Sequence, residues 1–168
     1  TFAISERNGV AWIDTKLNGK TVRLYNVHLK SNRISGETNS FAFRKDLFTK
    51  KIFPYIKHVL VQIRKQSKIR AAQAEELVEH IAECPHPLIV CGDFNEVPLS
   101  YPYRIISNGL SDAFEEKGTG FGFTFAGKFP GLRLDYVLVS EEIEVIDFEI
   151  RKLELSDHYP IIVDLKVK

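Results

Sequence analysis

The pattern of hydrophobic and polar positions predicts strands near both ends of the chain and helices between them. Alternating or continuous apolar runs bounded by turn residues indicate strands at residues 10–17, 21–29, 88–91, 132–139, 143–152 and 159–167. Asn18-Gly19-Lys20 separates the first two runs, which predicts a β-hairpin. The run at residues 88–91 is continuously apolar between Pro87 and Gly92, as in a strand buried on both faces.

Helical spacing of apolar residues begins near Phe41, and Pro54 predicts a break or kink between two helical pieces. Ser67 is expected to cap a further helix. Its buried stripe would consist of Ala74, Leu77, Val78 and Ile81. Residues 100–108 predict a short helix that ends at Asn108-Gly109. The order strand, helices, strand is consistent with a crossover connection within one sheet.

Composition indicates a globular chain with one hydrophobic core. The chain has 168 residues, 44% of them hydrophobic, and its net charge is +1. We expect residues 1–168 to form a single, partial domain, and we expect it to be a monomer. No apolar run approaches the length that spans a bilayer, and two cysteines are too few for a disulfide framework. The chain has no methionine and opens within a strand-like pattern, so we expect an excised fragment and assign no compartment.

Positive charge is concentrated in residues 44–70, where nine lysines and arginines accompany one acidic residue, Asp46. The simplest interpretation is the solvated face of a helix. The alternative is a surface that faces the phosphates of an anionic polymer or membrane, which would make affinity sensitive to salt.

Candidate chemistry lies at two strand ends. Asp93 and Asn95 follow the central strand and are two residues apart, so in extended geometry both could point at one metal, phosphate or water. The alternative is an Asx-turn that bonds only nearby backbone. His28 ends the face of residues 21–29 that also carries Asn26, where a histidine is more often a core residue than a catalyst.

A second pair of polar residues interrupts the C-terminal strands. Asp135 lies in an apolar strand, which is costly unless the carboxylate has a partner. His158 is the first candidate, because an Asp–His pair fixes the imidazole tautomer and improves its free nitrogen as a base. The alternative partners are Arg133 and Lys152. Asp157 would point away from His158 and be free for a metal, or would cap a turn.

Taken together, the motifs resemble the endonuclease/exonuclease/phosphatase superfamily. They are Asn26-Val27-His28-Leu29, Gly92-Asp93-Phe94-Asn95, the run Arg133-Leu134-Asp135-Tyr136 with its strand, and Ser156-Asp157-His158-Tyr159-Pro160. The superfamily includes pancreatic-type deoxyribonucleases, abasic-site endonucleases, neutral sphingomyelinases and inositol polyphosphate phosphatases. The resemblance implies a four-layer α/β/β/α sandwich of the DNase I type and metal-dependent hydrolysis of phosphate esters.

The resemblance also implies roles for the polar residues. His158 matches the general base that activates water, with Asp135 orienting it, and His28 matches a histidine that hydrogen-bonds the phosphate. Asp93 and Asn95 match residues that position the water, the phosphate oxygens or a metal.

Asp157 matches a carboxylate of the metal site, together with Asp93 and Asn95. Such hard oxygen ligands favour Mg²⁺ or Mn²⁺.

Two departures from the family pattern stand out. In the family, a strand that carries an asparagine is followed by a Gln-Glu pair, whose glutamate is a principal metal ligand. Neither feature precedes Asn26 in this sequence, and Glu6 lies in no such context. The family domain is also longer than this chain, so we expect its N-terminal portion to be absent from this sequence.

The expected function is a Mg²⁺-dependent phosphodiesterase or nuclease. His28 argues mildly against the abasic-site branch, and Leu132-Arg133-Leu134-Asp135 lacks the tryptophan motif of inositol phosphatases. The substrate is therefore expected to be nucleic acid or, as in a sphingomyelinase, a phospholipid headgroup. The alternative from another class is a non-catalytic module that keeps the fold and binds phosphate or nucleic acid.

Overall fold

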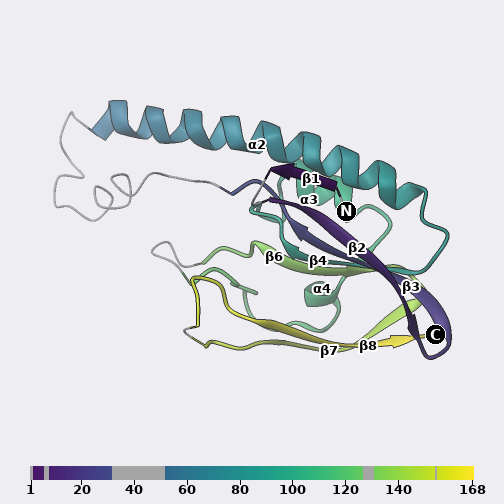
Figure 1. Cartoon of the computed structure of the whole chain (residues 1–168). Helices are drawn as coiled ribbons and strands as arrows, with labels where there is room; N and C mark the ends of the chain where they lie inside the picture. Colours follow the sequence, from purple (N-terminus) through teal and green to yellow (C-terminus); the bar gives the residue numbers. More distant parts are fainter. Residues whose placement is uncertain (1, 6–7, 32–51, 127–130, 154) are drawn as a thin grey trace.

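The computed structural model describes residues 2–5, 8–31, 52–126, 131–153 and 155–168, and it stacks helices on one sheet and that sheet on a second (Figure 1). The elements in chain order are β1 (Phe2–Ser5), β2 (Asn8–Leu17), β3 (Lys20–His28), α2 (Ile52–Ala82), β4 (Leu88–Asp93), α3 (Tyr101–Ile106), β5 (Ser111–Asp112), α4 (Ala113–Lys117), β6 (Asp135–Val139), β7 (Ile143–Ile150) and β8 (Ile161–Val167).

The larger sheet has six strands in the order β1-β2-β3-β4-β6-β5, and β7 pairs with β8 in a separate sheet. The predicted hairpin is confirmed: Leu17 pairs with Lys20, and Asn18 and Gly19 have φ values of 50° and 81°. Two central residues with positive φ form the turn that matches the twist of paired strands. The predicted crossover is also confirmed, because α2 connects β3 to its parallel neighbour β4.

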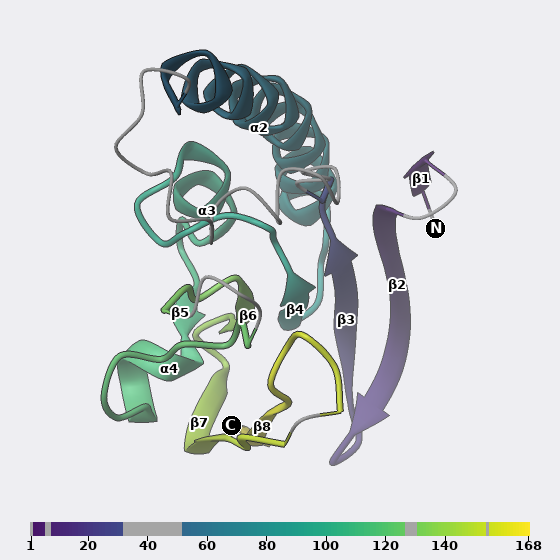
Figure 2. The same cartoon turned by 90° about the vertical axis from the view of Figure 1, so that its left-hand side faces the viewer.

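The central strands β3 and β4 of the larger sheet are buried on both faces by alternating side chains. Tyr25 and Val90 belong to the core cluster that includes Leu77 of α2, whereas Val22 and Ile89 belong to a second cluster with residues of β7 and β8. Figure 2 shows the resulting layers, with α2 and α3 on one side of β4 and β6 and the β7–β8 pair on the other. The short apolar run of β4 therefore lies at the centre of the molecule, as its continuous hydrophobicity indicates.

Helix α2 is one continuous helix of 31 residues, so the predicted N-cap at Ser67 is wrong, whereas the earlier helical piece that Pro54 was predicted to end lies outside the described residues. Pro54 lies in the first turn, where a missing N–H leaves no intrahelical hydrogen bond unmade. Ser67 lies in the interior of the helix. The predicted stripe is confirmed, because Ala74 and Leu77 are fully buried. The helical pattern predicted from residues 41–51 lies outside the described residues.

The basic segment divides into exposed and buried parts. Arg64, Lys65 and Lys68 of α2 are exposed, as a solvated face predicts. Arg70 is an exception, because only 1% of it is exposed. The prediction that it shares the exposure of its basic neighbours is therefore wrong.

The short elements were not predictable from periodicity. Strand β5 has two residues and α4 has five, too few for a repeat of either period. Strands β6 and β8 begin later than predicted, at Asp135 and Ile161, because the preceding residues leave the sheets to form loops.

In the part of the chain that the structure describes, no helix combines the length and apolar character needed to cross a membrane.

Gly92→Ala is expected to lower the free energy of unfolding by about 3 kcal/mol. Gly92 has a φ of 134°, and an added Cβ would lie 2.0 Å from the Val27 carbonyl oxygen of the neighbouring strand. Gly109→Ala is the control, since Gly109 has a φ of 79° with nothing within 4 Å, and it should cost only about 1 kcal/mol. Urea denaturation measures both, and equal losses would contradict the close-approach argument.

Candidate active site

Three polar side chains meet at one edge of the larger sheet because of strand register. His28 ends β3 and pairs with Asp93, which ends the parallel strand β4. Asp93 pairs in turn with Asp135, the first residue of the antiparallel strand β6. Directly paired residues present their side chains on the same face of a sheet. The main-chain ladder thus brings together residues that are far apart in the sequence.

His158 joins this row from the loop before β8. Its Nδ1 lies 2.7 Å from Oδ2 of Asp135, so the predicted hydrogen bond is present. The alternative partner Arg133 instead donates to Asp112 at 2.7 Å and lies 3.5 Å from Glu115. The backbone of His158 is held at the site by a β-bridge to Phe125.

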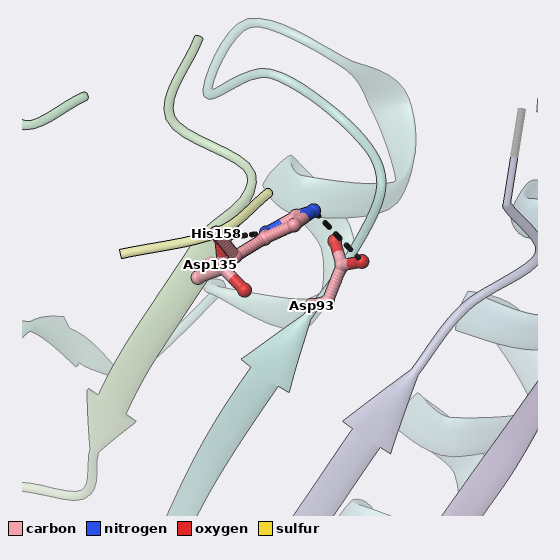
Figure 3. A group of neighbouring side chains, drawn as sticks. All are labelled: Asp93, Asp135 and His158. Carbon is pink, nitrogen blue, oxygen red and sulfur yellow. Dashed lines mark hydrogen bonds and ion pairs between the residues drawn. The ribbon is translucent and has the colours of Figure 1, made fainter. Parts of the chain in front are cut away.

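The imidazole of His158 lies between two carboxylates (Figure 3). On the side away from Asp135, its Nε2 is 4.0 Å from Oδ2 of Asp93. The ring of Phe125 packs edge-on against it, with ring centroids 5.2 Å apart. If Nδ1 carries the proton and donates it to Asp135, the lone pair of Nε2 faces the space beside Asp93.

Asp93 and Asn95 form a hydrogen-bonded turn at the tip of β4. The backbone N–H of Asn95 donates to Oδ1 of Asp93 at 2.8 Å, and the Asn95 side-chain amide donates to Oδ2 at 2.7 Å. The Asx-turn considered from the sequence is therefore present. It does not exclude a functional role, because Oδ2 of Asp93 also lies 3.8 Å from Nε2 of His28.

Asn95 adopts a left-handed backbone with a φ of 51°, which asparagine tolerates better than most residues. Its amide also donates to the Leu29 carbonyl at 3.2 Å, so it links the loops that follow β3 and β4. Held backbone strain of this kind is typical of functional loops.

The electrostatics of the site reflect crowded carboxylates. Burial raises the pKa of Asp93, and the nearby charge of Asp135 raises that pKa further, against the hydrogen bond from Asn95 and the two imidazoles. The hydrogen bond to Asp135 raises the pKa of His158, and burial opposes this. The hydrogen bond and the imidazoles do not fully offset the effect of burial and of Asp135 on the pKa of Asp93. A bound cation would therefore stabilise the ionised carboxylate of Asp93.

The cluster offers carboxylate oxygens to a divalent cation. Side-chain ligand atoms of Asp93, Asp135 and His158 all lie within 4.8 Å of one another. Carboxylate oxygens are the ligands that Mg²⁺ and Mn²⁺ prefer. Asp157 is exposed and is not part of this group, and its backbone carbonyl accepts a hydrogen bond from Ala126.

Two supporting contacts were missed in the sequence. Thr124 is fully buried, and its hydroxyl accepts hydrogen bonds from the backbone N–H groups of Leu134 and Asp135. Arg133 and Asp112 form a buried ion pair beside α4. The alternation of Thr124 with phenylalanines is the one local sign that its side chain points inward.

The sequence model of the Endonuclease/Exonuclease/phosphatase family matches residues 10–158. The chain belongs to this family. The matched range contains His28, Asp93 and Asn95 as well as Asp135, Asp157 and His158. The resemblance inferred from the four motifs is confirmed.

Solved structures share the fold of this family member at low sequence identity. A functionally unknown conserved protein from Enterococcus faecalis V583 has a TM-score of 0.64 at 16% identity, with 99% of this chain and 60% of that chain covered. The human Nocturnin catalytic domain has a TM-score of 0.61 at 19% identity, with 95% and 52% covered. A mannosyl-6-phosphatase from Bacteroides thetaiotaomicron VPI-5482 has a TM-score of 0.55 at 22% identity, with 94% and 56% covered.

The predicted fold class is confirmed by these likenesses, and the chain spans 52% to 60% of the length of the three solved structures. No curated protein sequence matches this chain. The family and the geometry together therefore direct attention to the cluster of Asp93, Asp135 and His158.

Asp93→Asn is expected to weaken Mn²⁺ binding about 10-fold or more, because it removes the most central carboxylate of the cluster. Titration of the full-length protein with Mn²⁺, followed by the electron paramagnetic resonance signal of the free ion, measures the change. Asp164→Asn is the control, since Asp164 is exposed on β8. Equal Mn²⁺ affinity of wild type and Asp93→Asn would rule out Asp93 as a ligand.

Proposed function

We propose that this protein is a Mg²⁺-dependent phosphoester hydrolase, acting as a phosphodiesterase or nuclease through a water activated by His158 and Asp135. The observation that carries the proposal is the 2.7 Å contact between Nδ1 of His158 and Oδ2 of Asp135, with Nε2 facing Asp93. An imidazole held by a carboxylate on one nitrogen is suited to accept a proton on the other.

In the proposed reaction, a water beside Asp93 gives its proton to Nε2 of His158 as its oxygen attacks phosphorus. The bond from phosphorus to the leaving oxygen breaks as the new bond forms, and the leaving oxygen keeps the electron pair and takes up a proton from solvent. Asp135 holds the imidazole in the productive tautomer and stabilises the imidazolium that results.

The other polar residues would stabilise the phosphate. His28 can donate a hydrogen bond beside the same carboxylate, and such donors disperse the charge that builds up on phosphate oxygens. The Asn95 amide donates to Asp93 and to Leu29, so Asn95 would act through its side-chain oxygen. Asp93 and Asn95, with Asp157 as a further proposed ligand, would hold Mg²⁺ or Mn²⁺. The cation supplies Lewis-acid stabilisation of the phosphate when bound.

Two observations favour a nucleic-acid substrate over a phospholipid headgroup. Phe121 and Phe123 are exposed, and their rings are stacked with centroids 5.3 Å apart and an interplanar angle of 7°. They precede Phe125, the residue in contact with His158, and exposed aromatic rings can stack against unpaired bases. The exposed Arg64, Lys65 and Lys68 of α2 would add phosphate contacts.

The solved relatives support phosphate chemistry in general. The human Nocturnin structure contains a bound sulfate anion, and another relative is a mannosyl-6-phosphatase. A sphingomyelinase-like lipid phosphodiesterase is the alternative enzyme. A non-catalytic module that binds phosphate or nucleic acid is the alternative from another class.

A substrate panel on the full-length protein tests these assignments. Bis-p-nitrophenyl phosphate, p-nitrophenyl phosphate, single-stranded and plasmid DNA, and sphingomyelin would each be incubated with Mg²⁺, Mn²⁺ or EDTA. Metal-dependent cleavage of the diester and of DNA supports the proposal, and preference for sphingomyelin selects the lipid alternative. Binding of DNA without cleavage of any substrate would select the non-catalytic module.

His158→Ala is expected to lower kcat about 100-fold to 10,000-fold with little change in KM, because it removes the proposed base. Hydrolysis of bis-p-nitrophenyl phosphate measures both constants. His86→Ala is the control, because His86 precedes β4 at the end of the strand opposite Asp93. A kcat near that of wild type would refute the role of His158.

Asp135→Asn is expected to lower kcat about 100-fold or more and to move the acid limb of the pH–rate profile to lower pH. The sign follows from the hydrogen bond to Asp135, which raises the pKa of His158, so its loss lets the imidazole deprotonate at lower pH. The pH dependence of kcat measures the shift. An acid limb that stays in place would show that Asp135 does not act through His158.

A further inference from the structure

Arg70 is the buried member of an otherwise exposed basic segment. It lies in α2 with 1% of its surface exposed, and its side chain ends in a cationic guanidinium group. Burying such a charge costs several kcal/mol unless hydrogen bonds and an opposite charge compensate. The groups that satisfy Arg70 therefore indicate what its burial stabilises.

Arg70 donates hydrogen bonds to the two loops that follow β3 and β4 and border the candidate active site. Its Nε donates to Oε1 of Glu96 at 2.7 Å, and one terminal nitrogen donates to the backbone carbonyl of Lys30 at 2.8 Å. One turn further along α2, Oε1 of Gln73 accepts a hydrogen bond from the backbone N–H of Lys30 at 2.8 Å. Both backbone groups of Lys30 are thus held by one helix.

These loops begin where the strand ladder stops. Strand β3 ends at His28 and β4 ends at Asp93, so Lys30 and Glu96 lie beyond the paired residues. Between them, the Leu29 N–H donates to the Asp93 carbonyl at 3.0 Å, and the Leu29 carbonyl accepts from Asn95. Asn95, which lies beyond the ladder, therefore depends on contacts outside the sheet for its position beside His28 and Asp93.

The same contacts reach the third strand. The carbonyl of Glu96 lies 2.8 Å from the hydroxyl of Tyr136, the neighbour of Asp135 in β6. A continuous set of hydrogen bonds thus runs from α2 through the loops after β3 and β4 to β6. The guanidinium group of arginine is planar and its N–H donors point in fixed directions, so it can hold a carboxylate and a carbonyl in one arrangement. The ammonium group of lysine does not fix the directions of its hydrogen bonds in this way.

We propose that Arg70 is a positioning residue that joins Lys30 to Glu96 and thereby holds the loops after β3 and β4, with Asn95, in place beside the paired residues His28 and Asp93. Its effect on turnover rests on the proposed hydrolytic function, whereas its effect on the two loops does not. Misplacement of reacting groups by about 1 Å can lower a rate about 100-fold, so small loop shifts suffice to change kcat.

The test compares Arg70→Met, Arg70→Lys and Glu96→Gln with Leu77→Ala in the full-length protein. Leu77 is fully buried on the same helix and belongs to the hydrophobic core, and its side chain makes none of the hydrogen bonds of the network. Leu77→Ala therefore lowers stability without removing a hydrogen bond of the network. All assays are run well below the unfolding temperature of the least stable variant.

The first readout is hydrogen exchange of the Leu29 and Lys30 amides, measured relative to Val90 in the centre of β4. Arg70→Met should accelerate their exchange relative to Val90 about 10-fold or more, whereas Leu77→Ala should change all three amides in parallel. Glu96→Gln should give a smaller acceleration because the Lys30 contacts remain. Parallel changes in every variant would overturn the proposal.

The second readout is the hydrolysis of bis-p-nitrophenyl phosphate. Arg70→Met should lower kcat about 10-fold to 100-fold with KM changed less than about 3-fold, and Arg70→Lys should restore little of the loss. A kcat for Arg70→Met equal to that of Leu77→Ala would overturn the proposal. If wild type itself hydrolyses no substrate, the proposed function fails, and the exchange readout alone decides whether Arg70 holds the loops. If Arg70→Met does not fold, Glu96→Gln decides by the same two criteria.

Discussion

The main-chain pairing of β3, β4 and β6 is the constraint on which the candidate site depends. It places His28, Asp93 and Asp135 side by side at one edge of the sheet. Two carboxylates brought together in this way repel each other, and the surrounding groups reflect this. Asn95 donates two hydrogen bonds to Asp93, and His158 binds Asp135, so the nearby polar side chains all act to stabilise negative charge.

The same pairing explains features that otherwise look unrelated to the site. Gly92 is needed because β3 and β4 approach so closely that a Cβ would meet the Val27 carbonyl. Beyond the last paired residues the backbone is no longer held by the ladder. There, Asn95 in its left-handed conformation shapes the loop after β4 from within. Arg70 of α2 holds the loops by hydrogen bonds from the helix that packs on the sheet.

Local patterns predicted much of the fold. Asn18-Gly19 predicted the hairpin, and the stripe that includes Ala74 and Leu77 predicted the buried face of α2, because turn type and helical period depend on neighbouring residues alone. Helix α2 tolerates Pro54 for a physical reason. A proline breaks a helix only in its interior, and the helix begins two residues before it, at Ile52.

The sequence by itself determined which residue types stand at the strand ends and in what order the four motifs follow, and this was enough to indicate the family. Only the tertiary structure decided which partners these residues have. Asp135 could have met Arg133 or Lys152, but the bridge between Phe125 and His158 brings the imidazole to it. The sequence pattern predicts Arg70 to be one more surface charge. Only the packing of α2 over the loops buries it against Glu96. Such contacts join residues far apart in the chain, so no local pattern specifies them.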